Sequence, residues 1–143
     1  MLKVLVAVDG SNHASRAIDY MLGKLRPVLD RAEIHLLNVQ PPVPGGARAA
    51  AMLGKQRMKD YHEAEGRAAL APAEKRLKAA GIPYFDHIVV GEPGPMIAEF
   101  AKEKGCDQIV MGTRGAAGAA GVLVGSVAMK VVHLASVPVL LVK

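Results

Sequence analysis

The sequence predicts an α/β fold, in the form of an open, doubly wound, Rossmann-like parallel sheet of five strands in the order 3-2-1-4-5 with helices on both faces. Short apolar runs without strict alternation are typical of strands covered on both faces. Between these runs, apolar residues recur at spacings of three and four, which predicts amphipathic helices. Alternating strands and helices favour a parallel sheet, because each right-handed crossover returns the chain in the same direction. We therefore expect residues 1–143 to form one domain.

The first strand is expected at residues 2–8, an apolar run that ends at the polar turn Asp9-Gly10-Ser11. The first crossover helix is expected at residues 13–29. Its buried stripe consists of apolar positions at helical spacing, namely Ala14, Ala17, Ile18, Met21, Leu22 and Leu25.

The second strand is expected at residues 33–39 and is followed by a proline-rich loop at residues 40–46. A long, alanine-rich helix should then cover residues 49–80 and stop at Gly81. Pro72 interrupts this helix. Because proline lacks an N–H and clashes with the preceding turn, it either kinks the helix or begins a second one.

The rest of the chain repeats the same alternation. Further strands are expected at residues 84–90, 107–111 and 137–142, and helices at residues 96–104 and 126–135. The last strand is apolar on both faces, so in a monomer it would be an exposed hydrophobic edge unless its own helices shield it. Pairing across a twofold axis would cover it, and we expect a homodimer through residues 137–142.

Composition limits the classes of function. Cys106 is the only cysteine, so an internal disulfide is impossible, a cytoplasmic location is expected, and the thiol should fill the core. No apolar run approaches the roughly twenty residues of a membrane span, and we expect no membrane insertion. The formal charge of +5 is spread over separate helix faces, and the few aromatic residues are scattered. This pattern argues against nucleic-acid binding.

A glycine-rich loop lies between the fourth strand and the following helix. It has the spacing Gly112-x2-Gly115-x9-Gly125-Ser126. Glycine permits positive φ and a close approach of ligand to backbone, and the N–H groups at a helix start attract anions. The alternative is a tightly packed turn without a ligand.

Topology brings this loop to a second candidate residue. In the predicted order the first and fourth strands are neighbours whose connections leave to opposite faces, which opens a crevice at their carboxyl ends. Asp9 and Gly112 both lie there. The pattern is not a P-loop, because no lysine precedes Ser126, and no residue that would orient water for hydrolysis is identifiable.

Simpler structural roles remain open for two of these residues. Ser126 is a preferred residue type for a helix N-cap, and Asp9 is able to close the Asp-Gly turn with its own side chain. The histidines show no metal-ligand spacing and are expected to be surface or core residues: His13, His35, His62, His87 and His133.

Four segments together resemble the universal stress protein family: VLVAVDGS at residues 4–11, IVMGTRG at 109–115, GSVAMKVV at 125–132 and SVPVLLV at 136–142. The resemblance covers the whole chain. The spacing of glycines and serine matches the motif of the family's ATP-binding branch, whose members resemble one another in being five-stranded α/β homodimers.

The resemblance implies a site for ATP or another adenine nucleotide such as cyclic AMP. It places Ala7, Val8 and Asp9 under the ribose and the adenine edge, and Val39 against adenine through its backbone. Met111 would form a wall of the same pocket. It also allows Asp9 to reach a phosphate-bound divalent cation such as Mg²⁺.

The phosphate side of the implied site comes from the glycine loop, through Gly112, Arg114, Gly115, Gly125, Ser126 and Val127. Related proteins often carry basic residues between the second and third glycines of the motif, whereas this chain has AAGAAGVLV. Phosphate neutralisation then depends on Arg114 and the backbone. Ordering a flexible loop costs conformational entropy, so we expect weaker affinity than the motif alone implies.

The leading hypothesis is a dimeric, nucleotide-dependent regulatory or stress-response module that holds ATP without efficient turnover and presents residues 41–55 to a regulated protein. One alternative is a slow ATP hydrolase or phosphotransferase, in which Asp9 positions a metal ion and Ser126 contacts the terminal phosphate. Another is a nucleotide-free dimeric scaffold.

Overall fold

The structure is a computed structural model that describes residues 1–43, 45–114 and 123–143. Its strands are β1 (Leu2–Ala7), β2 (Ala32–Gln40), β3 (Phe85–Val90), β4 (Gln108–Gly112) and β5 (Val139–Val142). Its helices are α1 (Asn12–Lys24), α2 (Arg26–Leu29), α3 (Gly46–Leu53), α4 (Lys55–Ala79), α5 (Pro93–Glu103) and α6 (Ser126–Leu134). All strand pairs are parallel, and the sheet order β3-β2-β1-β4-β5 confirms the prediction.

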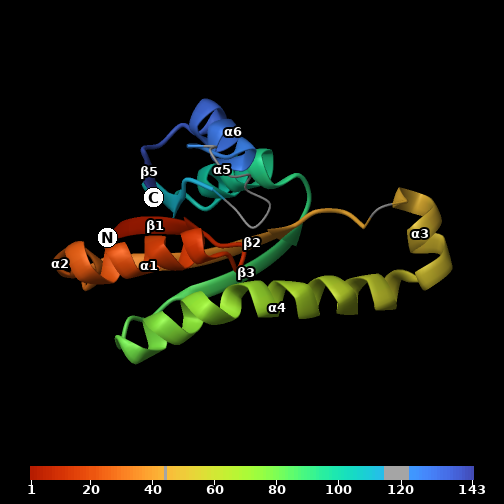
Figure 1. The fold of residues 1–143 in the computed structure, drawn as a ribbon, viewed down its shortest axis with the longest axis horizontal. Helices are drawn as coiled ribbons and strands as arrows, with labels where there is room; N and C mark the ends of the chain where they lie inside the picture. The colour runs from red at the N-terminus through yellow and green to blue at the C-terminus, as the bar shows by residue number, and fades with distance from the viewer. Residues whose placement is uncertain (44, 115–122) are drawn as a thin grey trace.

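Helices cover both faces of the sheet, because the central strands are apolar on both sides. In β1, Val4 and Val6 face the cluster that contains α1 and α4, whereas Leu5 and Ala7 face the cluster that contains α5 and α6. Figure 1 shows α5 and α6 on one side of the sheet and α4 on the other. Cys106 is buried in the second cluster, as expected for a core residue.

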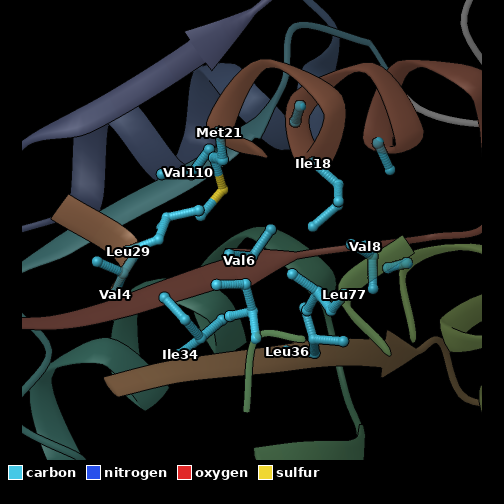
Figure 2. Close-up of a cluster of buried hydrophobic side chains, with 14 of the residues drawn as sticks. Val4, Val6, Val8, Ile18, Met21, Leu29, Ile34, Leu36, Leu77 and Val110 are labelled. Atoms are coloured by element: carbon cyan, nitrogen blue, oxygen red, sulfur yellow. The ribbon is translucent and has the colours of Figure 1, made fainter. Parts of the chain in front are cut away.

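The larger apolar cluster fixes the first crossover helix on the sheet. Figure 2 shows Ile18 and Met21 of α1 above Val6, with Leu36 and Leu77 below. These side chains are at most 1% exposed. Truncating such a residue to alanine typically costs about 2–5 kcal/mol, so this packing holds α1 firmly against β1.

Two expected helices are divided differently. The helix expected at residues 13–29 ends at Lys24, and the short α2 follows with Pro27 in its first turn. The helix expected at residues 49–80 is broken at Gly54, where φ is +81°, so that α3 is separate from α4. Figure 1 shows α3 at the far end of α4, away from the sheet.

Pro72 does not begin a new helix, because α4 continues through it. Leu70 and Ala73 on either side of the proline are buried against the sheet, and Leu77 is buried one turn later. Burial of this stripe outweighs the backbone hydrogen bond that the proline removes.

The loop expected at residues 40–46 is shorter than predicted, because β2 includes Gln40 and α3 begins at Gly46.

In the part of the chain that the structure describes, no helix is both long and apolar enough to cross a bilayer.

Candidate functional site

The register of the sheet brings the ends of β1 and β4 together. Val4 pairs with Gln108 and Val6 with Val110, so the turn after β1 lies beside the end of β4. At Gly112, a Cβ atom would lie 2.8 Å from the backbone carbon of His13 in α1. The absence of a side chain at this position therefore allows the close approach of α1 to β4.

The turn after β1 is held by its own side chains. Asp9 Oδ1 accepts a hydrogen bond of 3.0 Å from Ser11 N, and Gly10 has φ of +82°. Ser11 Oγ accepts a hydrogen bond of 3.2 Å from Ala14 N and is the N-cap of α1. The turn-closing role considered for Asp9 is thus confirmed. The same bond fixes its carboxylate in the turn beside the end of β4.

A buried amide supports this turn from β2, and sequence analysis did not single it out. Asn38 is 2% exposed, and its Nδ2 donates to Val8 O at 2.9 Å. Gln40 Nε2 in turn donates to Asn38 Oδ1 at 2.7 Å. The available signal was a lone asparagine inside the apolar run LLNV, because buried polar groups in strands usually have a specific partner.

The start of α6 lies next to the residue that follows β4. Gly125 is the N-cap, and its N–H donates to Thr113 O at 2.6 Å. Ser126 is the first helical residue, so the alternative in which it is the N-cap is wrong. Gly125 has no side chain that could cap the helix. The backbone N–H groups of the first turn of α6 are therefore oriented to donate hydrogen bonds to an anion at this end.

Two buried polar atoms near this helix start have no hydrogen-bond partner among the described residues. They are Oγ1 of Thr113, whose residue is 5% exposed, and Nε of Arg114. Most buried polar groups are paired in native structures, so unpaired ones point to an additional partner such as a ligand. Gly115 belongs to the same predicted site, but it lies outside the described residues.

Four of the five apolar residues of the predicted site belong to one cluster on the α5 and α6 face of the sheet. Ala7 and Met111 are buried in this cluster, and Val39 and Val127 pack against it while partly exposed. Val8, by contrast, is buried on the α1 and α4 face. A flat apolar ligand at the carboxyl ends of the strands would therefore contact the cluster from the α5 and α6 side.

A pocket of about 220 Å³ lies beside the helix start and is lined by Glu92, Pro93, Gly94, Ser126, Val127 and Lys130. Only Ser126 and Val127 were expected at the site. Lys130 of α6 forms an ion pair with Glu92, the N-cap of α5. Such a pair across two helices leaves no pattern in the sequence.

A second polar cluster lies on the same face of the sheet, towards the start of the strands. His35 Nδ1 lies 2.9 Å from His87 Nε2, and His35 Nε2 lies 2.7 Å from Glu33 Oε1. Burial lowers the pKa of His87, as do His35 and Lys104 nearby. The hydrogen bond to His35 lowers the pKa of Glu33. Each histidine alone fits the expected surface or core role, but their pairing depends on the β2–β3 register.

The fold and this arrangement define a doubly wound α/β protein whose candidate ligand site lies where the carboxyl ends of β1 and β4 meet. The chain belongs to the universal stress protein family, whose model matches residues 1–143.

Three relatives show the extent of the similarity. Universal stress protein MJ0531 of Methanocaldococcus jannaschii is 32% identical over 142 residues, which cover 99% of this chain and 81% of the relative. A universal stress protein solved in complex with cAMP is 31% identical, with a TM-score of 0.69 over 99% of this chain and 97% of that one. The Archaeoglobus fulgidus protein in complex with dAMP is 27% identical, with a TM-score of 0.71 over 100% and 98%.

Proposed function

We propose that this chain is an adenine-nucleotide-binding member of the ATP-binding branch of its family, acting as a dimeric regulatory or stress-response module. The observation that carries the proposal is a pair of buried polar atoms that find no partner within the described part of the chain, Thr113 Oγ1 and Arg114 Nε, beside the start of α6. The two relatives solved with cAMP and with dAMP give independent support for an adenine nucleotide.

In the proposed site the base and ribose lie over the ends of β1, β2 and β4. Ala7, Val39 and Met111 provide apolar contacts, and the backbone of Val8 and the Asp9 turn lie below the ribose. The Asn38 amide would act indirectly, because its hydrogen bond to Val8 O holds that backbone in place. A rigid supporting contact of this kind reduces the ordering cost of binding.

The phosphates are assigned to the start of α6 and the glycine loop, through Gly112, Arg114, Gly115, Gly125, Ser126 and Val127. Backbone N–H groups and the helix dipole favour an anion there. Asp9 would supply one carboxylate to a Mg²⁺ ion, and phosphate oxygens and water would provide its other ligands. This donor set fits Mg²⁺, which usually keeps several waters and binds few protein ligands.

The test is direct detection of nucleotide. Purified protein is heat-denatured, the supernatant is examined by mass spectrometry, and ATP with Mg²⁺ is titrated into nucleotide-free protein by calorimetry. We expect released adenine nucleotide or a saturable binding heat. No nucleotide and no heat would contradict the proposal and favour the nucleotide-free scaffold.

We expect binding without efficient turnover. Among the described residues the site offers the carboxylates of Asp9 and Glu92 and the hydroxyls of Thr113 and Ser126, but no lysine directly precedes Ser126 as in a P-loop. Phosphate release from ATP should therefore stay near the uncatalysed background. Substantial release that is lost in Asp9→Asn would instead favour the slow hydrolase.

A partner surface is proposed at residues 41–55. Within this segment α3 buries no residue, Met52 is 82% exposed, and Leu53 is 44% exposed. Large apolar side chains this exposed are typical of interaction sites when they lie together. The regulated protein would thus bind away from the nucleotide.

A further inference from the structure

Lys130 lies over the same helix start that is assigned to the phosphates. It follows Ser126 by four residues and lines the same pocket as Ser126 and Val127. Residues four apart lie on one face of a helix, and long side chains lean towards the helix N-terminus. The side chain of Lys130 therefore lies on the same face of α6 as Ser126, beside the pocket.

The stem of Lys130 is held against α5. A Cβ atom at Gly94 would lie 2.7 Å from Lys130 Cβ, so the two helices touch at this point. This contact fixes where the side chain leaves the helix. Its charged end then reaches Glu92 across the pocket.

Glu92 is a replaceable partner for this ammonium group. The side chains of Lys130 and Glu92 are 56% and 62% exposed, and an ion pair this exposed contributes little to stability. Glu92 makes no side-chain capping bond to α5. Exchanging Glu92 for a phosphate therefore costs little, whereas a doubly charged phosphate attracts the ammonium group more strongly.

We propose that Lys130 binds the outermost phosphate of a nucleoside triphosphate and thereby makes the site selective for triphosphates over monophosphates. This inference rests on the proposed nucleotide function. Lys130 would supply the positive charge that the stretch AAGAAGVLV between Gly115 and Gly125 lacks. In this arrangement a monophosphate would lie beside Thr113 and Arg114 and would not extend to Lys130.

The experiment measures dissociation constants for ATP and for AMP, each with Mg²⁺, by calorimetry on the full chain. The variants are Lys130→Gln, Lys130→Arg, Glu92→Gln and the control Lys102→Gln. Lys102 lies in the last turn of α5, at the opposite end from the pocket, and its loss changes net charge equally. Thermal melting of each variant checks that it is folded.

We expect Lys130→Gln to weaken ATP binding about tenfold and to leave AMP binding within about twofold, as for the loss of one charge-assisted hydrogen bond. Lys130→Arg should retain ATP binding, Glu92→Gln should strengthen it, and Lys102→Gln should change neither nucleotide. An unchanged ratio of ATP to AMP affinity in Lys130→Gln would overturn the role of Lys130 while leaving the proposed function intact. A wild-type chain that binds neither nucleotide would overturn both.

Discussion

Gly112 and Gly115 belong to the same motif, but we expect their substitution to have different effects. A Cβ at position 112 would lie 2.8 Å from His13 backbone, so Gly112→Ala should lower the free energy of unfolding by about 1–3 kcal/mol. Gly115→Val should instead abolish nucleotide binding and leave the chain folded, because the branched side chain would occupy the space assigned to phosphate. Urea denaturation and calorimetry separate the two effects. Equal loss of stability in both variants would contradict this division.

His87 makes the stability of the folded chain depend on pH. Burial lowers its pKa, and His35 and Lys104 lower it further, whereas Asp86 raises it. The unfolded chain, with a histidine pKa near 6.5, therefore binds more protons than the folded one as pH falls. The contribution of His87 to the free energy of unfolding is therefore fully present above about pH 6.5. It is lost as the pH falls from there through the lower pKa of His87 in the folded state.

The prediction for His35 and His87 concerns how steeply the stability changes with pH. His87→Gln keeps a polar group beside His35 but does not titrate, so the melting temperature should fall less between about pH 7.5 and 5.5 than in the wild type. His133→Gln, an exposed histidine on α6, is the control. Identical slopes in His87→Gln and the wild type would exclude His87 as the source.

At the scale of elements, α4 shows where local propensity and burial disagree. Pro72 removes an interior backbone hydrogen bond, yet the helix continues through it. Pro72→Ala should restore that bond and raise the free energy of unfolding by about 2 kcal/mol, measured in urea. Pro83→Ala, after the end of α4, should change stability far less. A destabilised Pro72→Ala would mean that ring packing outweighs the missing bond.

The strands were predictable because each buried run carries its own periodicity, and the order of the sheet followed from the alternation of elements. The helix break at Gly54 was not predicted, and the choice left open at Pro72 depended on the buried Leu70 and Ala73, which keep α4 continuous there. His35 with His87, and Lys130 with Glu92, are contacts between separate elements. Their partners depend on register and helix packing, which a single sequence does not contain. The binding roles assigned to the site remain predictions.

At the scale of the whole molecule, the edge of the sheet and one helix face remain partly open. β5 is an edge strand with partly exposed side chains, and α6 exposes Met129, Val132 and Leu134 by about half or more. We expect a homodimer that pairs at β5 and covers this face.

Val132→Lys should convert this dimer to a folded monomer, because it would bury a charge at the interface. Light scattering after gel filtration measures the mass. Val28→Lys changes a similarly exposed valine on α2 and should remain dimeric. A dimer that persists in Val132→Lys would move the interface elsewhere.

The separation of α3 from the sheet makes it a natural insertion point. α3 buries no residue, and Gly54 is exposed, with open space where a Cβ atom would lie. A short flexible peptide tag inserted after Gly54 should therefore leave the melting temperature and nucleotide affinity near wild type. The same insertion should abolish binding of a protein that recognises residues 41–55. An insertion at this point would thus separate the proposed nucleotide binding from the proposed partner binding in one variant.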